Sequence, residues 1–334
     1  MNKFLPVNRN DMKERGWEKL DFILVTGDAY ADHPSFGAAV ISRVLEDRGY
    51  RVGIIAQPQW REGPGPFTIM GRPELGFLVT SGNIDSMVAH YTSFKRKRRD
   101  DLYSPGGKAG LRPDRALIPY TARIREAYKD TAVILGGLEA SLRRLAHYDY
   151  WSGSLRRSIL ADSKADLLVY GMGEKAILEI AERLAAGESV KSLTDIRGTV
   201  FRSSQLPSLK DLTVLHSYEE TSGSKQLFAE NYAAAYRNTD PVTANVLAEK
   251  TGGQFIIQNK PAFPLEREEL DRVYALPYTR EAHPSYDEAG GIPALKEIKF
   301  SITSSRGCFG SCSFCSITFH QGKGVRSRSH QSII

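Results

Sequence analysis

Short apolar runs alternate with amphipathic stretches over the first half of the chain. Helical spacing of apolar side chains marks residues 34–48, 115–129 and 174–184. Short apolar segments bounded by glycine or charged residues stand between them and predict buried strands, at 21–26, 51–56, 76–80, 132–135 and 166–170. Strands that alternate with helices in this way predict a doubly wound α/β fold, in which a parallel sheet is covered by helices on both faces.

The pattern is less regular in the second half of the chain. It predicts strands at 198–202 and 254–258 and helices at 226–237 and 266–275. Three of the 16 prolines fall within residues 276–293, a density typical of a linker. We therefore predict three regions: an N-terminal domain at 1–195, a connecting region at 196–295 and a further region at 296–334.

The last region is predicted to open a new domain. Ile298, Phe300 and Ile302 alternate with polar residues, which predicts a strand over 296–303. The chain stops 19 residues after its last cysteine (334 − 315). Because so short a segment cannot close a core, we expect it to be the first unit of a (β/α) barrel that is truncated here.

Composition and charge narrow the class of protein. Hydrophobic residues make up 41% and charged residues 25%, as in ordinary globular proteins, and three cysteines are too few for a disulfide scaffold. The net charge of +6 (45 − 39) permits an anionic partner without requiring one. No apolar run approaches the roughly 20 residues of a membrane-spanning helix, and the N-terminus lacks the apolar core of a signal peptide. We expect a cytoplasmic protein with no membrane contact.

All three cysteines lie within eight residues, at Cys308, Cys312 and Cys315. In a reducing compartment such clusters serve metal or redox chemistry, and thiolates select iron–sulfur clusters, zinc or copper(I). Four thiolates would ligate every iron of a 4Fe-4S cluster, so three leave one iron open to another ligand. The alternative is a structural zinc site in which His320 is the fourth ligand.

The C-x-x-x-C-x-x-C spacing, with Phe314 before the last cysteine, resembles the signature of radical S-adenosylmethionine (SAM) enzymes. The wider text is similar to one branch of them, the YgiQ-type proteins. That similarity is carried by PGGKAGLRPDRA (105–116), GGLEASLRRLAHYDYW (136–151), LLVYGMGEK (167–175) and QNKPAFPLEREELDRVYALPYTREAHPSY (258–286). The resemblance implies a Rossmann-like N-terminal domain followed by a radical SAM barrel.

The same resemblance implies a chemistry. Cys308, Cys312 and Cys315 would hold a 4Fe-4S cluster whose open iron binds SAM, and Phe314 would lie near the adenine. An external electron donor would supply the electron that cleaves SAM to a 5′-deoxyadenosyl radical. Neither the substrate nor further catalytic residues are indicated by the sequence.

The loop after the first predicted strand suggests a variant of this function. Its text, from Asp32 and His33 onward, resembles the opening of cobalamin-binding domains fused to radical SAM barrels. His33 would then be the lower ligand of cobalt in a cobalamin-dependent methylase. The cobalamin motif, however, separates Asp and His by one residue, whereas here they are adjacent. This favours a cobalamin-free form of the fold.

Two further patterns point to nucleotides or nucleic acids. Gly171-x-Gly173-x-x-Ala176 matches the dinucleotide fingerprint, but Glu174 places a negative charge where a pyrophosphate would lie. The basic run at 95–99 could contact phosphates, and the tract at 142–151 interleaves bases and aromatics that either stack on nucleobases or pack within the protein. A nucleic-acid-binding module with a Cys₃His zinc site is therefore the competing, less favoured interpretation.

Overall fold

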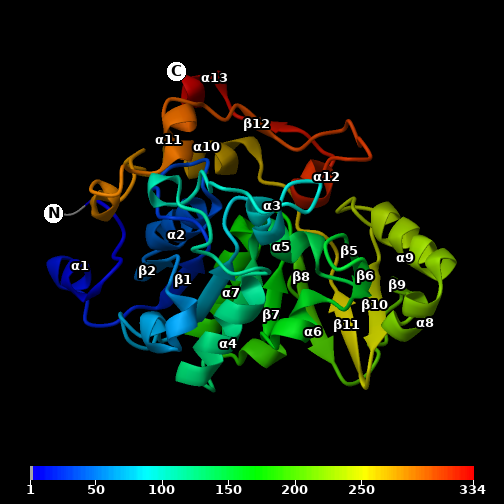
Figure 1. Ribbon diagram of the computed structural model, residues 1–334. Coiled ribbons are helices and arrows are strands. Elements are labelled where there is room, and N and C mark those ends of the chain that lie inside the picture. Colours follow the sequence, from blue (N-terminus) through cyan, green and yellow to red (C-terminus); the bar gives the residue numbers. More distant parts are fainter. Residues whose placement is uncertain (1–2) are drawn as a thin grey trace.

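A nine-stranded sheet runs through the middle of the protein, in the order β2-β1-β3-β4-β7-β8-β11-β10-β9 (Figure 1). The structure is a computed structural model and describes residues 3–334. Five neighbouring strands are parallel, as the alternation of strands and helices predicts. They are β1 (Phe22–Thr26), β2 (Val52–Ala56), β3 (Gly76–Thr80), β4 (Val133–Gly136) and β7 (Leu167–Val169).

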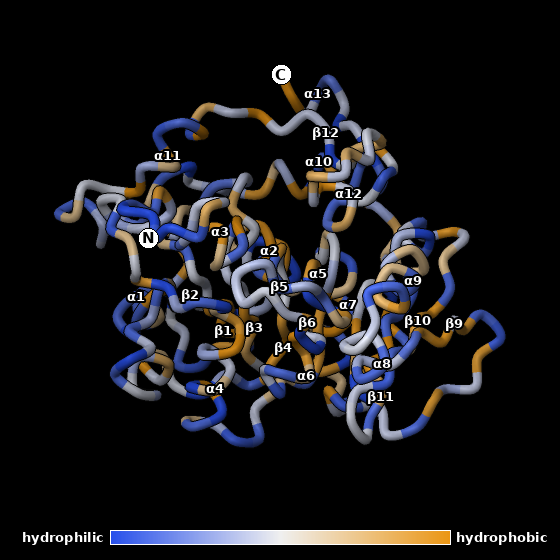
Figure 2. Tube along the Cα trace, turned by 45° about the vertical axis from the view of Figure 1, so that its right-hand side comes forward, coloured by the Kyte–Doolittle hydropathy of each residue, from blue (hydrophilic) through white to orange (hydrophobic). Residues whose placement is uncertain are grey.

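Both faces of this parallel part are buried, so its strands are apolar at nearly every position rather than at every second one. Phe22 and Leu24 of β1 pack on one face with α2 (Gly37–Asp47) and α7 (Glu174–Ala185). Ile23 and Val25 pack on the other with α4 (Leu117–Ala127) and α6 (Ile159–Ser163). Figure 2 shows these apolar strands at the centre and more hydrophilic chain around them. The predicted doubly wound arrangement is confirmed for this half of the sheet.

The remaining strands correct the prediction of a wholly parallel sheet. β8 (Thr199–Ser203) is antiparallel to β7 and to β11 (Gln254–Gln258), and β11 is antiparallel to β10 (Val246–Thr251). The cause at β10–β11 is a two-residue turn, Gly252-Gly253, which can join only antiparallel strands; Gly252 has the positive φ, +58°, that such turns need. These strands belong to the same sheet, so the boundary predicted at residue 195 does not coincide with a sheet edge.

Shorter elements surround the sheet. The edge strand β9 (Leu212–Val214) is parallel to β10. Of the helices described at residues 3–334, none combines the length and apolar character needed to cross a membrane. Apart from short 3-10 turns, the other helices and strands before residue 290 are α1 (Arg9–Glu14), α3 (Ser86–His90), α5 (Gly137–Leu142), β5 (His147–Asp149), β6 (Ser154–Arg156), α8 (Tyr218–Gly223), α9 (Lys225–Arg237) and α10 (Arg267–Ala275).

The C-terminal segment crosses above the edge where the parallel strands end (Figure 1). It consists of short elements: α11 (Pro293–Ile298), β12 (Ser305–Arg306), α12 (Ile317–His320), β13 (Arg326–Ser327) and α13 (His330–Ile333).

The strand predicted over 296–303 is wrong. Pro293 starts a helix, as proline does at a first helical position, and Ala294 and Leu295 pack beside Phe36. Phe300 is 87% exposed and Ile302 is 55% exposed, and no strand within the described part of the chain pairs with residues 299–304. The alternation of apolar and polar residues therefore has no sheet face to bury it here.

Strand β10 buries a carboxyl group. Glu249 is 1% exposed, and both of its oxygens accept the Ala146 amide, at 3.0 and 3.1 Å. Burial raises the pKa of Glu249 to about 8, although the Ala146 hydrogen bond opposes the shift. The folded protein therefore holds a neutral glutamic acid inside the sheet at neutral pH.

We predict that Glu249→Gln abolishes one component of the pH dependence of stability. The folded protein keeps the Glu249 proton up to about pH 8, whereas the unfolded chain releases it near 4.5. The free energy of unfolding therefore falls as pH rises between these values, by on the order of 1 kcal/mol per pH unit. Denaturant unfolding of both proteins across this range measures the slope. The exposed Glu18→Gln is the control and should keep it; an unchanged slope in Glu249→Gln would contradict the assignment.

Candidate cysteine site and adjoining cavity

The three cysteines lie on one loop, between β12 and α12. All are free thiols; Cys312 is exposed and the other two are partly exposed. A side chain at Gly310 would begin 3.4 Å from Cys308 Sγ and 3.7 Å from Cys312 Sγ, so both sulfurs flank this glycine. Gly307, with φ +87°, lies so close to the Gly324 carbonyl that a Cβ would be 2.2 Å from its oxygen. The loop therefore depends on glycine for its path.

The ligands that this loop offers fit an iron–sulfur cluster. Its metal-ligating side chains are three thiols, and soft sulfur ligands select such clusters. Within residues 3–334, no three His, Cys, Asp or Glu side chains lie close enough to hold one metal ion. The thiols are thus neighbours on an open loop rather than a gathered ligand set.

Arg306 anchors the loop on its N-terminal side. It is 8% exposed and forms an ion pair with Glu174, the first residue of α7, while its Nε donates to the Tyr274 hydroxyl at 2.9 Å. Burial alone would lower the pKa of Arg306, but the charges of Glu174 and Tyr274 and the hydrogen bonds to both together raise it, so the net shift is upward. Loss of one partner would leave a buried charge uncompensated, at a cost of roughly 3–5 kcal/mol.

His320 anchors the loop on its C-terminal side. Its Nδ1 lies 2.9 Å from the Ser141 hydroxyl of α5, which also accepts the Gly171 amide at 3.0 Å. Burial lowers the pKa of His320 to about 4, so the ring is neutral near pH 7. His320 is held by the sheet-bearing body and joins no group of metal ligands in the described part of the chain. In the described residues, neither the three cysteines alone nor the cysteines together with His320 are gathered around one point.

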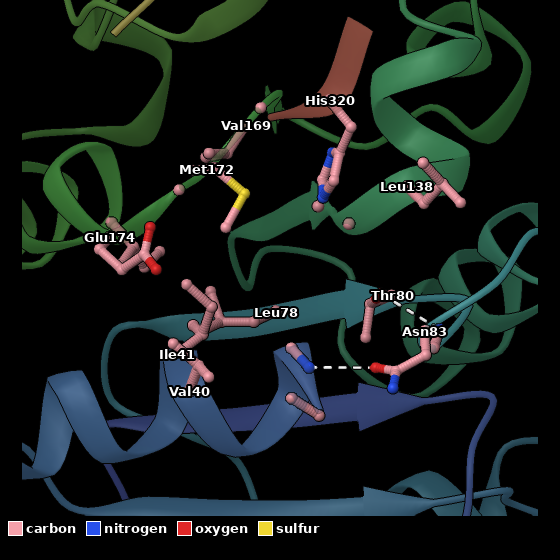
Figure 3. Close-up of a pocket in the computed structure, with 18 of the residues that line it drawn as sticks. Val40, Ile41, Leu78, Thr80, Asn83, Leu138, Val169, Met172, Glu174 and His320 are labelled. Carbon is pink, nitrogen blue, oxygen red and sulfur yellow. Dashed lines mark hydrogen bonds between the residues drawn. The ribbon is translucent and has the colours of Figure 1, made fainter. Parts of the chain in front are cut away.

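A cavity of about 430 Å³ lies beneath these two anchors, at the ends of β3, β4 and β7 (Figure 3). Glu174, Arg306 and His320 contribute to its wall. This is the edge at which ligands bind in doubly wound sheets. Its apolar wall includes Leu24, Val40, Ile41, Leu78, Ile134 and Val169.

His33 does not face an open coordination site. It is fully buried; its Nδ1 accepts the Ser35 amide at 3.1 Å and its Nε2 lies 3.2 Å from the Lys299 carbonyl. The neighbouring Asp32 forms an ion pair with Arg43. Both ring nitrogens are thus engaged, and His33 ties the loop after β1 to the residues after α11 rather than presenting a lower ligand for cobalt.

The other sequence candidates lie apart from one another. Phe314 is 92% exposed. Arg143 and Arg144 are buried, Arg143 in an ion pair with Asp85 and Arg144 stacked 4.9 Å from the Tyr170 ring, so these bases pack within the protein and do not face a nucleic acid. The basic run at 95–99 is exposed.

Sequence reasoning missed the anchors. It placed Glu174 at a helix start and noted its charge, but its partner Arg306 lies 132 residues away. Ser141 lies within a segment whose resemblance to YgiQ-type proteins was visible, yet nothing in its pattern distinguishes it from any other helical serine. Only the spacing of His320 from the cysteines offered a signal, and that signal suggested zinc.

The sequence model of the family described as Radical SAM N-terminal matches residues 4–301. The chain therefore belongs to that family. The match ends before Cys308, so it describes the sheet-bearing body and not the cysteine loop.

The chain is also similar to UPF0313 proteins, the YgiQ family, which confirms the resemblance found in the sequence. One from Clostridium botulinum (strain ATCC 19397 / Type A) is 56% identical over 331 residues, covering 99% of this chain and 51% of that protein. One from Clostridium perfringens (strain ATCC 13124) is 56% identical over 334 residues, covering 100% of this chain and 50% of that protein. The chain spans about half the length of these relatives.

Among solved structures, the radical SAM methyltransferase TsrM of Kitasatospora setae, with tryptophan and a SAM analog bound, has a TM-score of 0.49 and 16% identity, covering 93% of this chain and 44% of its own. A second TsrM structure, with cobalamin and a [4Fe-4S] cluster bound, has a TM-score of 0.47 and 15% identity. Similarity at this level does not bear on the function of this chain.

We predict that Glu174→Ala lowers the free energy of unfolding by roughly 3 kcal/mol or more, because it leaves the Arg306 guanidinium buried without its partner. Glu174→Gln keeps an acceptor and should lose less. Hydrogen exchange read by mass spectrometry should also quicken at residues 305–322 in Glu174→Ala. The matched control is Glu268→Ala, an exposed acid in the first turn of α10. Equal effects of both alanine variants would refute the anchoring role.

Proposed function

We propose that this chain supplies the cluster-binding loop of a radical SAM enzyme, in which Cys308, Cys312 and Cys315 hold a 4Fe-4S cluster. The observation that carries the proposal is a loop with three free thiols, fixed at both ends to a body of the Radical SAM N-terminal family. Residues 296–334 would then open the radical SAM domain, after the N-terminal domain at 1–195 and the connecting region at 196–295. The residues of the loop do not indicate the class of substrate.

Cys308, Cys312 and Cys315 would hold the cluster, and the chemistry it would supply is the one-electron reductive cleavage of SAM to methionine and a 5′-deoxyadenosyl radical, with the electron coming from an external donor. The chain's own residues would hold the cluster and stabilise the charge on its cysteine thiolates. The Gly310 amide lies 3.4 Å from Cys308 Sγ, where an N–H group stabilises thiolate charge. Phe309 and Phe314 are 84% and 92% exposed on the same loop. We propose that Phe314 lies beside the adenine when SAM is bound.

The test is anaerobic reconstitution of the chain with iron and sulfide. The wild type should take up about four iron and four sulfide per chain and give an electron paramagnetic resonance signal after reduction. Each single Cys→Ser variant at the three positions should lose most of the iron. His320→Ala should keep the cluster, because the proposal gives this residue no ligand role.

The opposite result defines the competing interpretation. A colourless chain that retains one zinc ion, lost in His320→Ala, would replace the proposal by a zinc site. The activity itself is tested in the full-length Clostridium perfringens relative. Formation of 5′-deoxyadenosine from SAM under reductant is expected, and none from a cluster-loaded protein would contradict radical SAM chemistry.

A further inference from the structure

The cavity at the ends of β3, β4 and β7 has the size and setting of a small-molecule site. Its volume of about 430 Å³ falls within the range of pockets that enclose a drug-sized ligand, roughly 300–1,000 Å³. Glu174 and Arg306 are the only charged residues among those that line it, and they pair with each other. A ligand there meets apolar walls and no uncompensated charge, which favours an uncharged molecule.

One hydrogen-bond acceptor of this cavity is an oxygen of Glu174. Its Oε1 accepts from Arg306, whereas its Oε2 is buried and has no hydrogen-bond partner in the described structure. Figure 3 shows the carboxylate on the α7 side, directed toward the space between the labelled side chains. A buried oxygen without a donor is costly to leave unpaired. A small turn of the carboxylate into the cavity would let a ligand supply that donor.

The second acceptor is the Nε2 of His320. The Ser141 hydroxyl has one hydrogen, which it donates to the Gly137 carbonyl at 2.9 Å. His320 Nδ1, 2.9 Å from the same hydroxyl, must then be the donor. A neutral imidazole that carries its proton on Nδ1 has a lone pair on Nε2. Figure 3 shows the His320 ring entering the cavity from the C-terminal segment, on a different side from Glu174.

Two other polar side chains at the wall, Asn83 and Thr80, already have partners. Asn83 accepts the Gly37 amide at 3.1 Å and donates to the Ser35 carbonyl at 2.9 Å. Thr80 Oγ1 accepts the Gly82 amide at 3.2 Å. What Glu174 and His320 themselves leave unused is acceptor capacity, at Oε2 and at Nε2.

We propose that this cavity binds an uncharged, largely apolar small molecule that donates N–H hydrogen bonds to Glu174 Oε2 and His320 Nε2. The site requires neither the iron–sulfur cluster nor SAM, and so it stands apart from the proposed function. Because Arg306 and His320 flank the cysteine loop, a bound ligand also reinforces both anchors of that loop.

A matched pair of probes tests the proposal by calorimetry on the iron-free 334-residue chain near neutral pH. 2-Aminobenzothiazole carries an amino donor, and benzothiazole has the same ring system without one. The amine should bind about tenfold more tightly, equivalent to about 1.4 kcal/mol. In His320→Phe, which keeps a ring but removes the acceptor, this preference should shrink. Equal affinities of the two probes for the wild type, or no binding of either, would overturn the proposal.

Two glycine variants localise the binding. A side chain at Gly136 would meet only the Val169 carbonyl oxygen, at 3.9 Å, and the residue lines the cavity in extended backbone, so Gly136→Leu should fill the space and abolish binding. Gly253→Leu, in the open β10–β11 turn, is the control and should bind as the wild type. Both should unfold cooperatively. Unchanged binding in Gly136→Leu would place the probe elsewhere and refute the site.

The tautomer is a second, independent readout. Nitrogen-15 chemical shifts of His320 should show a protonated Nδ1 and an unprotonated Nε2 in the free protein. The Nε2 resonance should move when 2-aminobenzothiazole is added. An Nε2–H tautomer would remove the acceptor and with it the proposal.

Discussion

The buried ion pair between Arg306 and Glu174 determines where the cysteine loop lies. Glu174 begins α7 at the edge where the parallel strands end, so its carboxylate is fixed by the core of the sheet. Arg306 stands two residues before Cys308 and is itself buried. Removing two charges from water is costly unless each compensates the other, which makes any displaced position of this segment unfavourable.

The parallel half of the sheet gives this arrangement its rigidity. β3, β4 and β7 end at one edge, and α5 and α7 begin there, so Ser141 and Glu174 project from neighbouring helices toward the same C-terminal segment. The antiparallel half contributes a different feature, the buried neutral Glu249. Cavity and loop are thus built on the part of the molecule whose strands are packed on both faces.

The sequence predicts the parallel strands and their helices well, because each is a short apolar run or an amphipathic stretch bounded by glycine, proline or charged residues. It does not predict β10, because Glu249 and Lys250 interrupt the apolar pattern. Nothing in the sequence indicates that the Glu249 carboxyl is buried and protonated. The strand expected at 296–303 failed because alternation reports only that one face is apolar, and no sheet covers that face here. The cysteine spacing identifies the loop, whereas both anchors depend on contacts over more than 130 residues that no local pattern encodes.

The double anchoring changes the chain entropy of metal binding. Arg306 and His320 are separated by 14 positions (320 − 306) and are attached to one body, so the intervening residues form a closed ring rather than a free arm. The entropic cost of closing a loop of this size is therefore met when the protein folds, before any metal binds. Because both ends of the loop are already fixed, bringing the three sulfurs together costs less conformational entropy than it would on a free segment. More of the free energy of metal ligation then contributes to affinity.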